Sequence, residues 1–230
     1  MRQRSTTAPA RFSLRFLLAA LVLNTGPDAG WFSYPPLSGP DYSPGKRVDV
    51  FAQLITFTEV AALSVAVSLI ATIFKLRAPG MTINRIPLFV WAIYATSLIQ
   101  VLGTPVIAIT IVLVFVERVF GFGIFDPTRG GDPVLFQDLF WSYSHPAVYN
   151  MILRSMGVMS ELVAAFSKKM TFGYSFVAFS SLAIAVFGFL VWAHHLFVAG
   201  ISTYAAMVFS FLSFVVAIPS AIKVFNWTAT

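Results

Sequence analysis

Five apolar stretches, each long enough to cross a lipid bilayer, constrain the fold of this chain more than any other feature. A helix rises about 1.5 Å per residue, and the hydrocarbon core of a bilayer is about 30 Å thick. Backbone polar groups need partners inside lipid, so such stretches fold as helices. The sequence therefore predicts an all-α, polytopic transmembrane bundle. The five full spans are Phe51–Phe74, Ile86–Val116, Leu135–Phe166, Tyr174–Val198 and Ala205–Trp227.

The composition agrees with an integral membrane protein. Hydrophobic residues make up 58% of the chain and charged residues 10%, and the mean hydropathy is +0.82. Soluble domains carry about 25% charged residues, so the soluble classes are excluded. The net charge of +6 is typical of nucleic-acid binding only where the basic residues form a patch. The chain has no cysteine, which excludes disulfides, thiolate metal sites and thiol nucleophiles.

The N-terminal segment has two interpretations. Residues 1–15 carry four arginines and no acid, and the apolar stretch Phe16–Leu23 follows. A basic start before a short apolar core is typical of a signal peptide, or it is part of a transmembrane helix. We interpret residues 1–23 as a truncated helix. Residues 24–49, rich in Gly, Pro and Asp, are predicted to be an external loop, and residues 51–227 the five transmembrane helices.

Basic residues in the connections indicate the topology. Alternate connections are richer in them, and by the positive-inside rule the richer set is cytoplasmic. This predicts that both termini face the cytoplasm. The richer set is Arg2, Arg4, Arg11, Arg15, Lys75, Arg77, Arg85, Lys168 and Lys169, and the poorer set is Lys46, Arg47, Arg118 and Arg129.

All three histidines of the chain lie inside apolar stretches. His145 lies in one, and the neighbours His194 and His195 lie in the next. An ionisable residue at membrane depth is by default a functional-site hypothesis. Neutral imidazole suits copper, zinc, iron and nickel, and three such ligands leave a coordination position open. Tyr149 follows His145 by four residues, so a helix places the phenol on the same face. The alternative is that each imidazole merely hydrogen-bonds a neighbouring helix.

Three motifs carry a resemblance to a known family. They are His-Pro-x-Val-Tyr at 145–149, Trp-x-His-His at 192–195 and Ile-Pro-x-x-x-Lys-Val-Phe at 218–225. Their order and spacing resemble subunit I of the haem-copper terminal oxidases. Most relatives have a glutamate after His-Pro, where this chain has Ala147. A branch of the family replaces that glutamate with a Tyr-Ser pair before the histidine, which Tyr143 and Ser144 match.

The resemblance implies a role for each matching residue. It assigns the copper called CuB to His145, His194 and His195, and a covalent bond with His145 to Tyr149. It places Lys223 in the K-type proton path, with Ser220 and Ser213 as its partners and Ser160 near the entrance. A second path ends near Tyr143 and Ser144, and Trp141 and Trp192 pack beside the copper. On the residues alone, membrane lysines also snorkel, serines bond carbonyl groups, and tryptophans fill cores.

The resemblance covers the central part of the family's twelve-helix subunit I, from about Gly30 to Thr230. It implies a cytochrome c oxidase of a bacterial-type inner (plasma) membrane that reduces dioxygen to water and pumps protons. A quinol oxidase is the close alternative, because another subunit selects the electron donor. All three histidines are assigned to copper, so no residue is left to ligate haem in the usual way. The expected partners are the missing N- and C-terminal parts of subunit I, subunit II, cytochrome c or quinol, and membrane lipid, without nucleic acid.

Other interpretations remain open. The chain is expected to be a fragment, a piece of a split gene or a decayed copy that is inactive alone. A non-catalytic membrane scaffold would explain the missing haem ligands, and a proton channel or transporter would explain buried Lys, Glu and Tyr residues. Asp138 stands where relatives usually have histidine, and Arg154 replaces a proline. Glu59, inside a span, faces either a polar seam or water.

Overall fold

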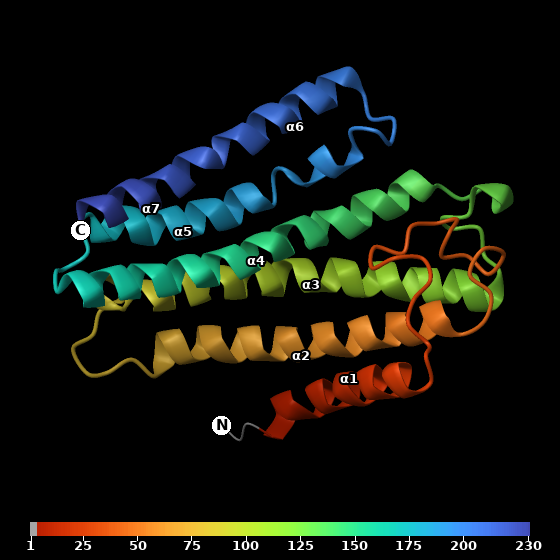
Figure 1. Ribbon diagram of the computed structural model, residues 1–230, viewed down its shortest axis with the longest axis horizontal. Helices are drawn as coiled ribbons and strands as arrows, with labels where there is room; N and C mark the ends of the chain where they lie inside the picture. The colour runs from red at the N-terminus through yellow and green to blue at the C-terminus, as the bar shows by residue number, and fades with distance from the viewer. Residues whose placement is uncertain (1–3) are drawn as a thin grey trace. The chain divides into compact units, whose positions relative to one another are not determined.

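Every regular element in the part of the chain that the structure describes, residues 4–230, is a helix. The computed structural model (Figure 1) thus confirms the all-α prediction. The elements are α1 (Arg4–Val22), α2 (Arg47–Lys75), η1 (Ile83–Arg85), α3 (Leu88–Phe120), η2 (Pro127–Arg129), α4 (Pro133–Ser167), α5 (Tyr174–Gly188), η3 (Trp192–Leu196), α6 (Thr203–Val215) and α7 (Ala217–Ala229). The first three residues of the predicted N-terminal helix lie outside the described residues.

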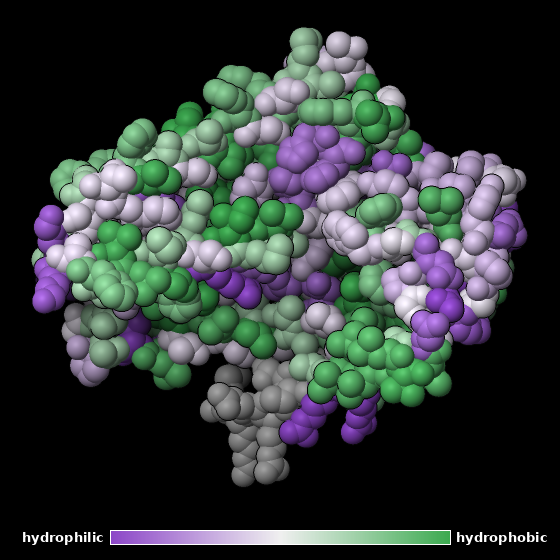
Figure 2. Space-filling model, in the orientation of Figure 1, coloured by the Kyte–Doolittle hydropathy of each residue, from purple (hydrophilic) through white to green (hydrophobic). Residues whose placement is uncertain are grey.

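Four segments of the described chain are long and apolar enough to cross a membrane. They are α2, α3, the stretch from α5 through η3, and the stretch from α6 through α7. Helix α4 has the length for a fifth span, with 35 residues. Polar residues around His145 make it less apolar than the others. Figure 2 shows apolar side chains gathered on the visible face, and large exposed side chains such as Phe211, Phe214 and Phe225 suit contact with lipid.

Some helix boundaries differ from those expected from the sequence. Helix α3 continues to Phe120, beyond the predicted end of this span at Val116. The last predicted helix is divided at Val216 into α6 and α7. Pro219 has no backbone N–H and cannot donate to the carbonyl group four residues earlier, which explains the interruption.

The chain forms two compact units, and three helices contribute to both. Unit 1 holds the described residues up to Val65 together with Thr104–Trp141. Unit 2 holds Ala66–Gly103 and Ser142–Thr230. The boundaries therefore fall within α2, α3 and α4.

Arg118 organises unit 1. Its Nε donates to Asp49 Oδ1 at 2.8 Å, and its terminal nitrogens donate to the carbonyl groups of Ser38, Ser43 and Gly45. Only 5% of the Arg118 side chain is exposed. One guanidinium thus joins the end of α3, the predicted external loop and the first turn of α2.

Glu117 stabilises the loop that follows α3. Its Oε2 accepts hydrogen bonds from the backbone N–H groups of Ile124, Phe125 and Asp126. The loop continues into η2, where the Thr128 side chain and backbone N–H both donate to Asp126 and lower the pKa of that carboxyl group. Glu117 therefore anchors this loop to the end of α3.

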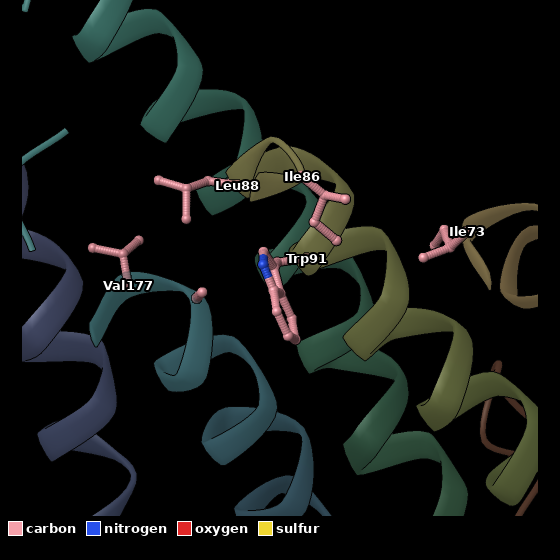
Figure 3. Packing of buried hydrophobic residues seen from close by; sticks show 6 residues of the cluster. Ile73, Ile86, Leu88, Trp91 and Val177 are labelled. Atoms are coloured by element: carbon pink, nitrogen blue, oxygen red, sulfur yellow. The ribbon is translucent and has the colours of Figure 1, made fainter. Parts of the chain in front are cut away.

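Unit 2 contains the core that positions the site. Ile73, Ile86, Leu88, Trp91 and Val177 are buried together, and Figure 3 shows Trp91 between α3 and α5. The Trp91 indole donates to the Tyr174 hydroxyl, which donates to the carbonyl group of Ile86. In the same unit α5 lies beside α7 (Figure 1), and η3 packs against α6.

Replacing Arg118 with Met tests its role. We expect the free energy of unfolding to fall by about 3 kcal/mol, because Asp49 is left largely buried with only the long 3.7 Å contact to the exposed Lys46. The measurement is thermal or denaturant unfolding in detergent. Arg129→Met is the matched control, because its ion pair with Asp126 is partly exposed, 40% for the arginine side chain, and surface pairs contribute about 0–1 kcal/mol. Equal losses in the two variants would contradict this role.

Candidate metal centre

Helix α4 carries His145 and Tyr149 one turn apart. His145 is 6% exposed, and its ring centroid lies 4.8 Å from that of Tyr149, edge to face. This is the arrangement that the spacing of four residues predicts. The helix therefore presents an imidazole and a phenol side by side.

His194 and His195 lie on the 3-10 segment η3, which corrects the expectation of one helix from Tyr174 to Val198. Helix α5 ends at Gly188. Phe189, Leu190 and His194 then donate backbone hydrogen bonds to carbonyl groups three residues earlier. Short 3-10 stretches often mark functional positions. Successive side chains of an α-helix diverge by about 100°, whereas these two ring centroids lie 4.5 Å apart.

The three imidazoles converge, as the sequence predicted. The ring centroid of His145 lies 4.4 Å from that of His194 and 5.2 Å from that of His195. His145 Nδ1 lies 3.0 Å from His195 Nε2, and one nitrogen from each ring lies within 4.8 Å of the others. An ion with bonds of about 2 Å can bind nitrogens that lie up to roughly 4 Å apart. Small rotations of the rings would therefore bring all three nitrogens within reach of one ion.

The chemistry of this cluster fits a transition metal. Nε2 of His145 is buried and has no hydrogen-bond partner among the described residues. A buried polar atom needs a partner, and in a cluster of imidazoles an ion of copper, zinc, iron or nickel is a suitable one. With three protein ligands, a further coordination position would remain open to a substrate.

Ser213 supports one of these imidazoles from outside the cluster. Its Oγ lies 2.9 Å from His194 Nδ1 and donates to the carbonyl group of Phe209. Such partners fix the tautomer and the orientation of a metal-binding histidine. Ser213 was predicted to assist Lys223, whereas the structure places it against His194.

Lys223 is 1% exposed and has partners that the sequence did not indicate. Its Nζ donates to Ser181 Oγ at 2.7 Å and to the carbonyl group of Val177 at 3.1 Å, both on α5. Ser220, the other predicted partner, donates to Val216 on its own helix. Ser181 could have been suspected only as one of several serines on a predicted span.

Ser160 lies farther along α4. It donates to the carbonyl group of Met156 and accepts a hydrogen bond from the Trp227 indole at 3.0 Å. In the structure it joins α4 to α7. A role at the entrance of a proton path stays a prediction.

A chain of polar side chains joins α3 and α4 and escaped the sequence analysis. Asn150 Nδ2 donates to Gln100 Oε1 at 2.8 Å, and Gln100 Nε2 donates to the Tyr143 hydroxyl at 3.0 Å. All three side chains are at most 9% exposed, and Ser144 is buried as well. The one signal in the sequence that could have indicated this chain is that Gln100 and Asn150 each place an amide side chain inside a predicted span.

The two tryptophans have different surroundings. The Trp192 ring packs against Phe209 with centroids 5.5 Å apart. Trp141 belongs to an aromatic group of unit 1, where it contacts Trp31 and Phe140 and donates to the Tyr34 hydroxyl. Packing of both beside a metal stays a prediction.

Two charged residues also have partners. Thr104 donates to Glu59 Oε2 at 3.1 Å, which favours a polar seam over contact with water. Glu161 accepts a hydrogen bond from the backbone N–H of Phe89 at the start of α3. Both carboxylates therefore have identified protein donors.

Comparison with known proteins identifies related chains. A model of the family described as cytochrome c and quinol oxidase polypeptide I matches residues 7–230. Cytochrome c oxidase subunit 1 of Thermostichus vulcanus is 42% identical over 214 residues, which cover 93% of this chain and 38% of the relative. Cytochrome c oxidase subunit 1 of Cereibacter sphaeroides is 39% identical over 205 residues, which cover 89% of this chain and 36% of the relative.

A relative with a different electron donor in its name also matches. Cytochrome bo(3) ubiquinol oxidase subunit 1 of Buchnera aphidicola is 38% identical over 216 residues, covering 93% of this chain and 33% of the relative. The chain spans between a third and two fifths of the length of these relatives. Membership of the family therefore rests on nearly all of this chain and on part of each relative.

Gly188 allows Tyr149 to lie against the end of α5, and Gly188→Ala tests this contact. A Cβ at Gly188 would lie 2.9 Å from Tyr149 Cδ2. We expect the free energy of unfolding to fall by about 1–3 kcal/mol, because the ring must move in a packed site. Thermal unfolding in detergent measures the loss. Val186→Ile adds one carbon on the same helix at an exposed position and is expected to change little. A stable Gly188→Ala variant would refute the close packing.

Proposed function

Since the chain belongs to the cytochrome c and quinol oxidase polypeptide I family, we propose that it forms the copper-binding part of an oxidase that reduces dioxygen to water. The observation that carries the proposal is the convergence of His145, His194 and His195 beside Tyr149. When bound, copper would supply electron transfer and an open coordination position. Four electrons and four protons then convert one dioxygen molecule into two of water.

His145, His194 and His195 are the proposed copper ligands. His145 comes from the long helix α4, and the other two come from η3, which packs against α6. Ser213 orients His194 through Nδ1, so that its other nitrogen is directed to the cluster. The ligands thus stand on packed elements, which suits a centre whose geometry must stay fixed.

Tyr149 is the proposed source of a proton and an electron at the centre. Its ring is held between His145 and Gly188. The contact with His145 supports the covalent bond that the family resemblance implies, and this bond remains part of the proposal. The phenol hydroxyl is the atom that would release the proton.

Two proton paths from the cytoplasm are proposed. One passes Lys223, whose Nζ is held by Ser181 and the carbonyl group of Val177, with Ser160, Ser213 and Ser220 as further hydroxyl groups. The other ends near Tyr143 and Ser144, where hydroxyl groups relay protons without a buried charge. Proton pumping is part of the proposal.

Haem does not fit the histidines of this chain. The sequence has three, and the described residues bring all of them into one cluster. We therefore propose that haem is held by other parts of a subunit I, and that subunit II passes electrons from cytochrome c. A quinol oxidase is the alternative, supported by the ubiquinol oxidase relative. A bacterial inner membrane with both chain termini in the cytoplasm is the proposed location.

Copper binding is the first test. We expect the purified, detergent-solubilised chain to bind about one copper ion and no haem, because its three histidines form one cluster. His194→Ala should abolish tight binding, and Ser213→Ala should weaken it roughly tenfold to a hundredfold. Elemental analysis and copper titration provide the measurements.

Ser202→Ala is the matched control for the copper titration. Its hydroxyl accepts from Ala205 at the start of α6, on the same segment but in a separate contact. The control should bind copper like the wild type. Equal copper affinity in the wild type and His194→Ala would overturn the copper assignment and leave a non-catalytic membrane scaffold as the better proposal.

Lys223→Met tests the first proton path. In the assembled oxidase we expect turnover to fall roughly tenfold or more, because the variant removes a group that can carry a proton inside an apolar core. Lys169→Met, in the exposed turn after α4, is the control. Turnover is measured as dioxygen consumption. Comparable rates for both variants would argue against a path through Lys223.

A further inference from the structure

The polar chain Asn150–Gln100–Tyr143 has a defined direction. Asn150 donates to the Gln100 carbonyl oxygen, and Gln100 donates in turn to the Tyr143 hydroxyl. A phenol has one hydrogen to donate and two lone pairs to accept with. Because one lone pair receives the Gln100 N–H, the phenol's own proton is directed away from Gln100.

The backbone is arranged to make this contact. Tyr143 and Asn150 are seven residues apart, so two turns of α4 place them on one face. Gln100 lies opposite, on α3, and Gly103 is one turn from it. A Cβ on Gly103 would lie 2.6 Å from Tyr143 Cδ2. Glycine therefore lets the phenol ring lie against α3 within reach of the amide.

These side chains are costly to place here. Gln100 is 4% exposed and Asn150 9%, on two helices long enough to cross a membrane. Asn150 Oδ1 has no hydrogen-bond partner among the described residues. An unpaired buried amide oxygen costs free energy, which two aliphatic side chains would avoid. The arrangement suggests a task beyond joining two helices.

We propose that Gln100 and Asn150 are positioning residues that fix the orientation of the Tyr143 hydroxyl for proton transfer. The proposal rests on the proposed function and extends its second proton path. Amide groups hold their protons too tightly to relay them readily, so Gln100 acts through Tyr143. Asn150 acts one step farther away, by holding the Gln100 amide in place.

The alternative is simple adhesion between α3 and α4. Hydrogen bonds between membrane helices stabilise their packing only modestly. Adhesion alone would change stability when Gln100 is replaced, but it would not require a particular state of the phenol. The band of the phenol oxygen and the turnover, measured on the same variants, together separate the two explanations.

The experiment records the infrared C–O stretching band of ring-labelled tyrosine in the solubilised full chain. Tyr143→Phe identifies the band of Tyr143. Gln100→Leu should shift that band, because the oxygen loses its donor, and Asn150→Leu should shift it less. Ser97→Ala is the control, because Ser97 is also buried on α3 but bonds the carbonyl group of Ile93.

Turnover is measured in the assembled oxidase with the same variants. We expect Gln100→Leu to lower kcat about tenfold with an unchanged KM for dioxygen, because proton delivery is affected and dioxygen binding is not. Ser97→Ala should keep the wild-type kcat.

The outcomes separate the two proposals. A shifted band with a lower kcat supports both. A shifted band in a protein whose wild type consumes no dioxygen keeps the orienting contact and rejects the oxidase function. An unmoved band in Gln100→Leu overturns the positioning role, and so does a shifted band with wild-type kcat.

Discussion

Polar side chains inside lipid must find their partners within the protein, and this requirement organises unit 2. Lys223 reaches Ser181 and the carbonyl group of Val177. Gln100 joins Tyr143 to Asn150, and His194 contacts Ser213. Apolar packing between membrane helices gains little over contact with lipid. These polar contacts therefore fix which faces of the helices meet, and the candidate metal centre forms where they meet.

The backbone departs from regular helix where the site needs it. Helix α5 ends at Gly188, and the histidine pair follows on η3. Irregular backbone at membrane depth is tolerated where it is buried in protein. Gly188 also admits the Tyr149 ring, and Gly103 admits the Tyr143 ring. Two glycines on separate helices thus determine how closely two tyrosine rings pack against those helices.

The sequence predicted the helices, because the length of an apolar stretch is a local signal, and the resemblance carried by the three motifs implied that His145 meets His194 and His195. It missed the end of α5 at Gly188, since an apolar stretch looks the same whether its backbone is α-helical or 3-10. It also did not indicate the groups that Lys223 bonds in the structure. Ser220 and Ser213 share its helical segment, whereas Ser181 lies on another helix. Which side chains bond each other across two helices depends on how the helices pack. The spacing of residues along one helix does not give this information.

Helix α4 carries two polar faces. His145 and Tyr149, four residues apart, face the histidine cluster, and Tyr143 and Asn150, seven apart, face Gln100. This explains why α4 is less apolar than the four candidate spans. A helix with two polar faces is costly in lipid unless neighbours cover both. The histidine cluster covers one of these faces and Gln100 covers the other, so the proposed copper ligands and the proposed proton path both depend on how the neighbouring segments pack on α4.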